Sequence, residues 1–264
     1  MLVNELKDDL FAYLGTKDRR RCERREGELL DSYDLTGLRT CSSRIDYREN
    51  LYLVDALESL LTDQVEIPAR DLRVVDVGSK NWNYVFGLER FWRHVDQGEG
   101  RRVEMLGFEI DGHGVYRNLR SRCDYARAYV AQTGNSRVDY RVDDFMACDQ
   151  TAVDAVTMFY PFMTRYALLQ WGLPLSCFGP GDLLRRALTV LRPGGVLVVF
   201  NQTATERDIL HGLLTRLGAD IVCAEPLRSK LVHYHHRAVD RWATVACTQH
   251  EGAQGATPTV SLRV

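Results

Sequence analysis

The segment from Leu72 to Tyr84 dictates how the rest of this chain can fold. Residues 72–77 read Leu-Arg-Val-Val-Asp-Val. A β-branched run this short, without helical periodicity, predicts a buried parallel strand. Gly78 and Ser79 follow at once, and a glycine at the carboxyl end of a first strand allows a sharp turn and a close approach of the backbone to a ligand. The segment therefore predicts an open α/β sheet with a crevice at this strand end.

The rest of the chain alternates between amphipathic segments and short apolar runs. Apolar residues at helical spacing predict helices at residues 1–14, 43–63, 84–95, 115–131, 179–191 and 206–217. Short β-rich runs predict strands at residues 103–110, 137–142, 152–159, 196–200, 219–224, 231–236 and 243–248. This alternation favours a mostly parallel sheet covered by helices. We expect residues 231–236 and 243–248 to pair as a closing antiparallel hairpin, and residues 251–264 to form a flexible tail.

Charge and cysteine content narrow the classes of function. The formal net charge is −2, which gives no general attraction to a polyanion, so we do not expect nucleic-acid binding. The sequence contains no apolar run of about 18 residues and no apolar signal core near its acidic beginning, so we expect no membrane span and no secretion. The seven cysteines contain no C-x-x-C pair, which is typical of reduced thiols in a cytoplasmic protein.

The arginine-rich stretch at residues 17–28 has two interpretations. Its arginines alternate with acids, which is typical of a solvated helix with i,i+4 ion pairs. A contact surface for phosphate or RNA is the alternative.

The junction Leu-Arg-Pro-Gly-Gly at residues 191–195 carries the most specific family signal. Pro193 ends the preceding helix, and the paired glycines permit a tight reversal into a buried strand. With the acidic residue and glycine at Asp76 and Gly78, this junction resembles the class I S-adenosylmethionine-dependent methyltransferases. The family loop continues as Gly-x-Gly-x-Gly, whereas this chain has Lys80 and Trp82 at the second and third glycine positions.

The resemblance implies a fold and a division of the chain. The expected fold is a Rossmann-like three-layer sandwich with a mostly parallel seven-stranded sheet and a C-terminal antiparallel hairpin. An N-terminal helical extension would occupy residues 1–67, the methyltransferase domain residues 68–250 and the tail residues 251–264. The cofactor would be S-adenosylmethionine.

The resemblance also assigns cofactor contacts to the strand ends. Glu109, after the second strand, would accept hydrogen bonds from both ribose hydroxyls, with Asp111 as its substitute. Asp144 with Phe145 would bind the adenine, Asp143 being the alternative register. An aromatic corner at residues 159–162 would shield the methyl cation. The complete set of expected cofactor residues is Asp76, Gly78, Ser79, Asn81, Trp82, Glu109, Ile110, Asp143, Asp144, Phe145 and Phe159.

Catalytic groups are harder to predict, because methyl transfer needs alignment and exclusion of water more than covalent help. Tyr160 and His113 are the candidate bases for an acceptor that must lose a proton. The histidines at 233, 235 and 236 are residues of a type that binds metals, but no third ligand is evident on their strand face. We therefore expect no metal site.

Methyl transfer to a small-molecule acceptor is the leading hypothesis. The alternatives are a catalytically inactive scaffold or regulator, in which Lys80 and Trp82 narrow the methionine end of the crevice, and an RNA methyltransferase. A nicotinamide-dependent reductase is the remaining alternative, and the missing Gly-x-Gly-x-x-Gly fingerprint and the predicted final hairpin argue against it.

Overall fold

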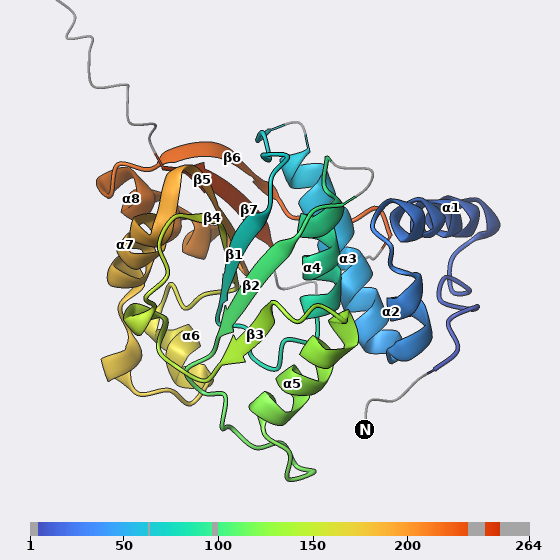
Figure 1. Cartoon of the computed structure of the whole chain (residues 1–264), viewed down its shortest axis with the longest axis horizontal. Coiled ribbons are helices and arrows are strands. Elements are labelled where there is room, and N and C mark those ends of the chain that lie inside the picture. Colours follow the sequence, from blue (N-terminus) through green and yellow to red (C-terminus); the bar gives the residue numbers. More distant parts are fainter. Residues whose placement is uncertain (1–4, 63, 97–99, 232–240, 249–264) are drawn as a thin grey trace, which may run out of the picture.

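The structure is a computed structural model that describes residues 5–62, 64–96, 100–231 and 241–248. Its centre is one seven-stranded sheet with the strand order β3-β2-β1-β4-β5-β7-β6 (Figure 1). The strands are β1 (Leu72–Val77), β2 (Val103–Phe108), β3 (Val138–Arg141), β4 (Val153–Phe159), β5 (Leu191–Asn201), β6 (Asp220–Pro226) and β7 (Trp242–Cys247). β1 to β5 pair in parallel, and β7 lies antiparallel between β5 and β6. The predicted α/β fold class is therefore confirmed.

Alternating side chains of the central strands build a core on each face of the sheet. Leu72 and Val74 of β1 belong to one buried cluster, whereas Val75 and Val77 belong to the other. Because successive side chains of a strand point to opposite faces, a strand covered on both faces must be apolar almost throughout. This requirement explains the valine-rich runs of β1 and β5.

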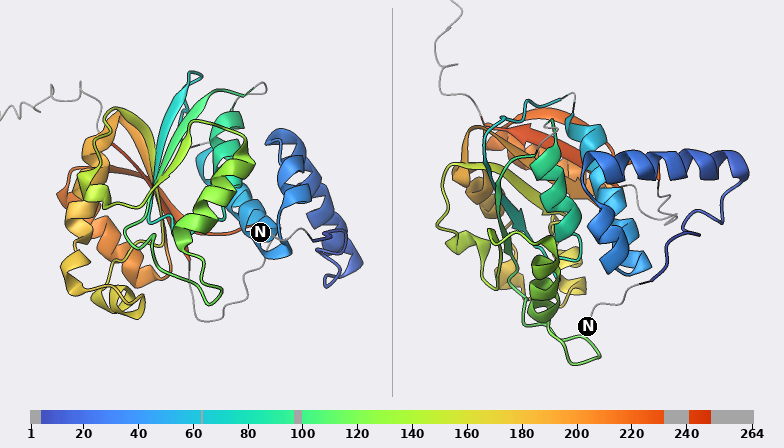
Figure 2. Two further views of the ribbon diagram at one scale, coloured as in Figure 1. Left: turned by 60° about the horizontal axis from the view of Figure 1, so that its bottom comes forward. Right: turned by 45° about the vertical axis from the view of Figure 1, so that its right-hand side comes forward.

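Helices cover both faces, so the sheet is the middle of three layers (Figures 1 and 2). One face carries α3 (Arg44–Leu61), α4 (Val85–His94) and α5 (Arg122–Thr133), and the other carries α7 (Pro180–Val190) and α8 (Ala204–Arg216). Short elements complete this part of the chain: the 3₁₀ turns η1 (Phe145–Ala147) and η2 (Leu175–Cys177), and α6 (Arg165–Gln170).

Two further helices precede α3 on the outer side of the first layer. They are α1 (Thr16–Ser32), which projects from the body in Figure 2, and α2 (Thr36–Cys41). The arginine-rich stretch lies in α1, as predicted, and Arg19 forms an i,i+4 ion pair with Glu23. The predicted helix at 1–14 is wrong for its described part, since residues 8–13 form turns and none of residues 5–14 is helical.

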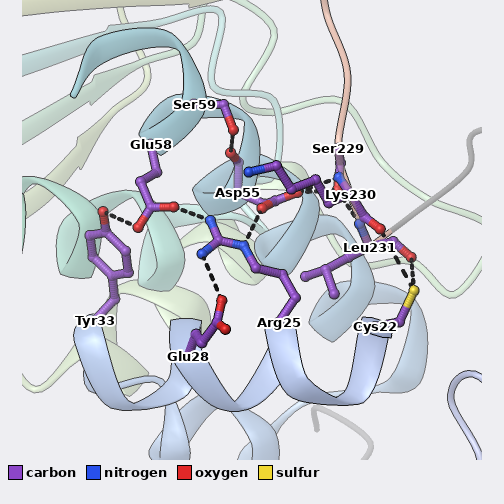
Figure 3. A network of polar contacts seen from close by, with 10 residues as sticks. All are labelled: Cys22, Arg25, Glu28, Tyr33, Asp55, Glu58, Ser59, Ser229, Lys230 and Leu231. Atoms are coloured by element: carbon purple, nitrogen blue, oxygen red, sulfur yellow. Dashed lines mark hydrogen bonds and ion pairs between the residues drawn. The ribbon is translucent and has the colours of Figure 1, made fainter. Parts of the chain in front are cut away.

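A buried carboxylate on α3 joins α1 to the segment that follows β6 (Figure 3). Asp55 accepts a hydrogen bond from Arg25 Nε of α1 at 2.8 Å. Its other oxygen accepts from the hydroxyl of Ser229 at 2.7 Å and from the backbone N–H of Lys230 at 2.6 Å. Because Asp55 is fully buried, these three donors compensate a charge that would otherwise be costly. The network fixes α1 and residues 229–231 against α3.

Two predicted elements need correction. The helix predicted at 115–131 begins only at Arg122, because Ser121 and Asp124 form a capping box that stops it from extending toward residue 115. The strand that pairs with β7 is β6, at residues 220–226; of the partner predicted at 231–236, residues 232–236 lie outside the described residues.

The proline-glycine junction also differs in detail from its prediction. α7 ends at Val190, and the junction is already part of β5. Gly194 has a φ of 71°, and a Cβ on Gly195 would lie 2.8 Å from the carbonyl oxygen of Arg192. Both positions therefore require glycine, for backbone conformation and for close packing.

Candidate functional site

A cavity of about 750 Å³ opens at the carboxyl ends of β1, β2, β4 and β5. In the sheet, β1 has β2 and β3 on one side and β4 and β5 on the other, so the strand order reverses at β1. Open α/β sheets bind ligands at such a point, because the diverging connections leave a crevice there. The volume lies in the upper part of the range of roughly 300–1,000 Å³ that is usual for ligand pockets.

The loop after β1 has the backbone shape that glycines would give, although two of its glycine positions are filled by other residues. Gly78, Lys80 and Trp82 have φ values of 75°, 55° and 52°. A side chain at such φ costs of order 1–2 kcal/mol. The peptides of Lys80 are held on both sides, because its N–H donates to Glu109 Oε2 at 2.7 Å and its carbonyl accepts from the hydroxyl of Tyr140. Tertiary hydrogen bonds therefore maintain a conformation that glycine usually supplies.

Trp82 lies beneath the loop and not in the cavity. Its side chain is fully buried, and its ring centroid is 6.0 Å from that of Tyr140. A Cβ on Gly107 of β2 would lie 2.8 Å from the indole Cη2, so the indole rests on this glycine. Trp82 is not among the described residues that line the cavity and therefore does not narrow it. Lys80 does line the cavity, with its ammonium 5.2 Å from the ring centroid of Trp171.

Glu109 lies between the two loops that border the cavity. Its Oε2 accepts the N–H of Lys80, and its Oε1 accepts the N–H of Asp111 at 2.9 Å. Arg122 approaches the same oxygen at 3.9 Å and pairs with Asp111 at 2.6 Å. Each carboxylate oxygen has more than one lone pair, so Glu109 retains acceptor capacity on the side that lines the cavity.

Asp76 supports this site from below. It is fully buried and accepts hydrogen bonds from the hydroxyls of Thr157 at 2.5 Å and Tyr84 at 2.8 Å. Burial raises the pKa of Asp76 to about 6, and the two hydroxyl donors oppose that rise. Tyr84, and not Asp76, reaches the cavity. Ser79 is buried as well, and its hydroxyl donates to the carbonyl of Asp76 at 3.0 Å.

The end of β3 brings a second pair of carboxylates to the cavity. Asp143 and Asp144 are exposed and line it. Asp144 caps η1, with Oδ1 accepting the N–H of Met146 at 2.9 Å, which leaves its other oxygen for a ligand. Phe145 is buried against Phe108 in an edge-to-face contact at 5.6 Å. Part of the Phe145 ring therefore already packs in the core, which leaves less of it to stack on a ligand.

Aromatic side chains form most of the remaining wall. Those that line the cavity are Tyr52, Tyr84, Phe108, Phe145, Phe159, Tyr160, Phe162, Trp171, Phe178 and Phe200. The connection between β4 and α7, which includes α6 and η2, supplies Trp171 and Phe178. Trp171 contacts two cations, because Arg122 is 4.9 Å and the Lys80 ammonium 5.2 Å from its ring centroid. These contacts hold the connection beside the loops that follow β1 and β2.

The structure brings most of the predicted site residues together. Gly78, Glu109, Ile110, Asp143, Asp144, Phe145, Phe159 and Tyr160 line the cavity. Four other predicted residues flank lining residues in the sequence but are not among the described residues that line the cavity: Asp76, Ser79, Asn81 and Trp82. His113 is exposed and also lies outside it, so of the two candidate bases only Tyr160 faces the cavity.

Sequence reasoning missed one side of the cavity. Glu49, Tyr52 and Leu53 of α3 line it, as do Gln202 after β5 and Arg241 before β7. The i, i+3, i+4 spacing of the α3 residues indicated a common face, but a core-facing stripe has the same spacing.

The described residues contain no group of three or more histidine, cysteine or acidic side chains that could hold a metal ion. Histidines 233, 235 and 236 lie outside the described residues. The part of the chain that the structure describes also has no helix long and apolar enough to cross a membrane.

Comparisons with known proteins agree on the fold. No protein-family model and no curated protein matches the sequence. Among solved structures, geranyl diphosphate C-methyltransferase from Streptomyces coelicolor A3(2) matches with a TM-score of 0.52 and 14% identity, over 77% of this chain and 81% of that one. Ribosomal protein L11 methylase from Lactobacillus delbrueckii subsp. bulgaricus matches with a TM-score of 0.50 and 12% identity, over 77% and 80%.

A third similar structure has a different activity. The [4+2]-cyclase SpnF matches with a TM-score of 0.51 and 15% identity, over 89% of this chain and 98% of that one. At such identities the likeness establishes the fold and not the reaction. The sheet order, the antiparallel β7 and these neighbours together identify the chain as a protein with the class I S-adenosylmethionine-dependent methyltransferase fold.

Proposed function

We propose that the protein is a methyltransferase that binds S-adenosylmethionine in the cavity and methylates a small molecule. The observation that carries this proposal is the convergence of Glu109, the β1 loop and an aromatic wall at the switch point of the sheet.

The residues present fit this cofactor. A Cβ on Gly78 would meet nothing within 4 Å, so the loop is open toward the cavity at that point. Glu109 offers acceptor lone pairs for the ribose hydroxyls, and Asp144 offers an oxygen for the exocyclic amine of the adenine. Aromatic faces favour a nearby cation by about 0.5–2 kcal/mol, which suits a sulfonium.

When bound, the cofactor supplies a methyl group on a good leaving group: the acceptor's lone pair forms the new bond, and the sulfur keeps the electrons of the old one. The protein's own contribution is alignment and exclusion of water. The connection that carries Trp171 and Phe178 covers the cavity, and the walls hold the acceptor in line. Tyr160 is the described candidate base within the cavity, for an acceptor that releases a proton.

The charge of the cavity argues for a small molecule over RNA. Its acidic lining residues are Glu49, Glu109, Asp143, Asp144 and Asp182, against the basic Lys80 and Arg241. Such a lining repels a polyanionic backbone. An inactive scaffold gains less support from Trp82 than from Lys80, because the indole lies below the loop whereas Lys80 lines the cavity.

Calorimetric titration with S-adenosylhomocysteine, the demethylated cofactor, tests the proposal. We expect binding in the micromolar range and no binding of NAD under the same conditions. Absence of S-adenosylhomocysteine binding in a folded sample would refute the proposal. If S-adenosylhomocysteine binds, incubation of the protein with labelled S-adenosylmethionine and an extract of small metabolites shows whether label is transferred.

A further inference from the structure

The end of the cavity farthest from Glu109 carries a basic side chain, that of Arg241. Only two of the described lining residues are basic, Lys80 and Arg241. Lys80 belongs to the β1 loop and contacts Trp171 on the cofactor side. Arg241 lies at the opposite side of the sheet centre, directly before β7, where the antiparallel strand begins beside the end of β5.

Arg241 is held beside two tyrosines that line the same cavity. Its guanidinium carbon is 5.4 Å from the ring centroid of Tyr160 and 6.0 Å from that of Tyr52. The carbonyl of Arg241 accepts the N–H of Leu227 at 2.8 Å, which ties the residue to the chain leaving β6. The backbone bond thus anchors the residue, and the two ring contacts place its guanidinium at the cavity wall.

A neutral hydrogen-bond donor lies next to this cation. β5 and β7 are antiparallel with Asn201 opposite Trp242, so Gln202 follows at the position opposite Arg241. Both residues line the cavity. The backbone N–H of Gln202 donates to Glu206, and no hydrogen bond within the described parts of the chain uses its side-chain amide.

The rest of this end is mainly aromatic. Phe159 and Phe200 pack with their centroids 4.7 Å apart, and Tyr84 meets Phe159 edge to face at 5.4 Å. Leu53 adds an aliphatic surface from α3. An apolar surface of this kind, with two donors at one corner, recognises a molecule with an apolar body and an acceptor group at one end.

We propose that the acceptor is an apolar small molecule that carries an oxyanion, such as a carboxylate, and that Arg241 and Gln202 bind this oxyanion. The proposal rests on the proposed function, because it assigns the far end of the cofactor cavity to the acceptor. The planar guanidinium can donate two parallel hydrogen bonds to a carboxylate, which fixes orientation as well as position. The oxyanion is a handle, and the methylated atom lies elsewhere on the acceptor.

The test compares two fluorescent probes that share one skeleton. 8-Anilinonaphthalene-1-sulfonate carries an oxyanion, and N-phenyl-1-naphthylamine lacks it. Both are titrated into the full-length protein, with and without saturating S-adenosylhomocysteine. We expect the protein to bind the sulfonate probe in both conditions and Arg241→Gln to weaken it about tenfold or more, since hydrogen bonds to charged groups have this weight. Binding of the neutral probe should change less than twofold.

Three further variants sharpen the comparison. Arg241→Lys should recover only part of the sulfonate affinity, because it keeps the charge but loses the two parallel donors, and Gln202→Leu should weaken the sulfonate probe only. Arg207→Gln is the matched control, since Arg207 also covers an aromatic ring, that of Trp242 at 3.8 Å, but does not line the cavity.

Equal loss of both probes in Arg241→Gln would show a structural role and overturn the proposal. Unchanged sulfonate binding in that variant, or no sulfonate binding to the parent protein, would overturn it as well. The proposed function fails separately, through absence of S-adenosylhomocysteine binding, and the arm without that ligand still reports on the oxyanion site.

Discussion

Replacing Glu109 by glutamine tests the cofactor side of the cavity most directly. The carboxylate is 6% exposed and accepts one backbone N–H on each oxygen, from Lys80 and from Asp111. Glutamine has nearly the same shape but only one acceptor oxygen. Its NH₂ group would face one of these backbone donors, so one of the two hydrogen bonds must be lost.

The size of the effect follows from these contacts. A hydrogen bond to a charged group contributes about 1.5–3 kcal/mol, so we expect Glu109→Gln to lower the free energy of unfolding by that amount. The same substitution removes one acceptor for the ribose hydroxyls. Because 1.4 kcal/mol corresponds to a tenfold change in affinity, the dissociation constant of S-adenosylhomocysteine should rise roughly 10- to 150-fold.

Urea unfolding and calorimetry measure the two quantities on the same sample. Glu104→Gln is the matched control on β2, because Glu104 is half-exposed and makes only a surface ion pair with Arg73 at 3.7 Å; we expect less than about 0.5 kcal/mol there. A stability loss in Glu109→Gln with an S-adenosylhomocysteine affinity within threefold of the parent would refute the ribose assignment. The carboxylate would then serve only to fasten the two loops.

Three other predictions concern groups that support the site. The pKa of Asp76 is about 6 in the folded protein against 3.8 for an ordinary carboxyl, so the folded state holds the proton more tightly and stability falls as pH rises from 4 to 6. Relative to Asp76→Asn, the parent should lose about 2 kcal/mol of unfolding free energy between about pH 4 and pH 6 in urea unfolding, because both titrations are only partly complete within that window, and parallel pH curves would contradict this. Gly107→Ala should destabilise by about 1–3 kcal/mol because its Cβ would overlap a buried indole, whereas Gly27→Ala, with nothing within 4 Å, should be neutral or stabilising; equal thermal shifts would refute the packing. Arg25→Met should lower the free energy of unfolding by about 3–5 kcal/mol, because it leaves a buried carboxylate on α3 without its cation. The control Arg24→Met should lower it by less than about 0.5 kcal/mol, and a small loss in both variants would show that the network is dispensable.

The fold was predictable because its signals are local. β1, β2, β3 and β4 lie within one or two residues of their predicted ranges, since each is a short apolar run with clear breaks. The errors occur where two patterns compete. Val115 and Leu119 have helical spacing but are exposed in a turn, because the capping box at Ser121 starts the helix later.

The candidate site was predictable only at the strand ends. Glu109 and Asp144 could be located because parallel strands place their carboxyl ends at one edge of the sheet. The other wall comes from α3, from the connection with Trp171 and from Arg241, which is far from β1 in sequence. These residues meet only through packing, so no local pattern marks them.

The β1 loop shows which features of the site follow from the sequence and which follow only from the tertiary structure. The sequence by itself determined that a strand ends at Gly78 and that the next two glycine positions hold Lys80 and Trp82. Their size left open that they narrow the crevice. Only the tertiary structure decided where each side chain goes: Lys80 lines the cavity, whereas the indole of Trp82 lies beneath the loop, where Gly107 makes room for it. The left-handed backbone at Lys80 is held by its N–H, which donates to Glu109, and by its carbonyl, which accepts from the hydroxyl of Tyr140. The physical reason is that a side chain's direction depends on the space that distant residues leave for it, and a linear sequence does not specify that space.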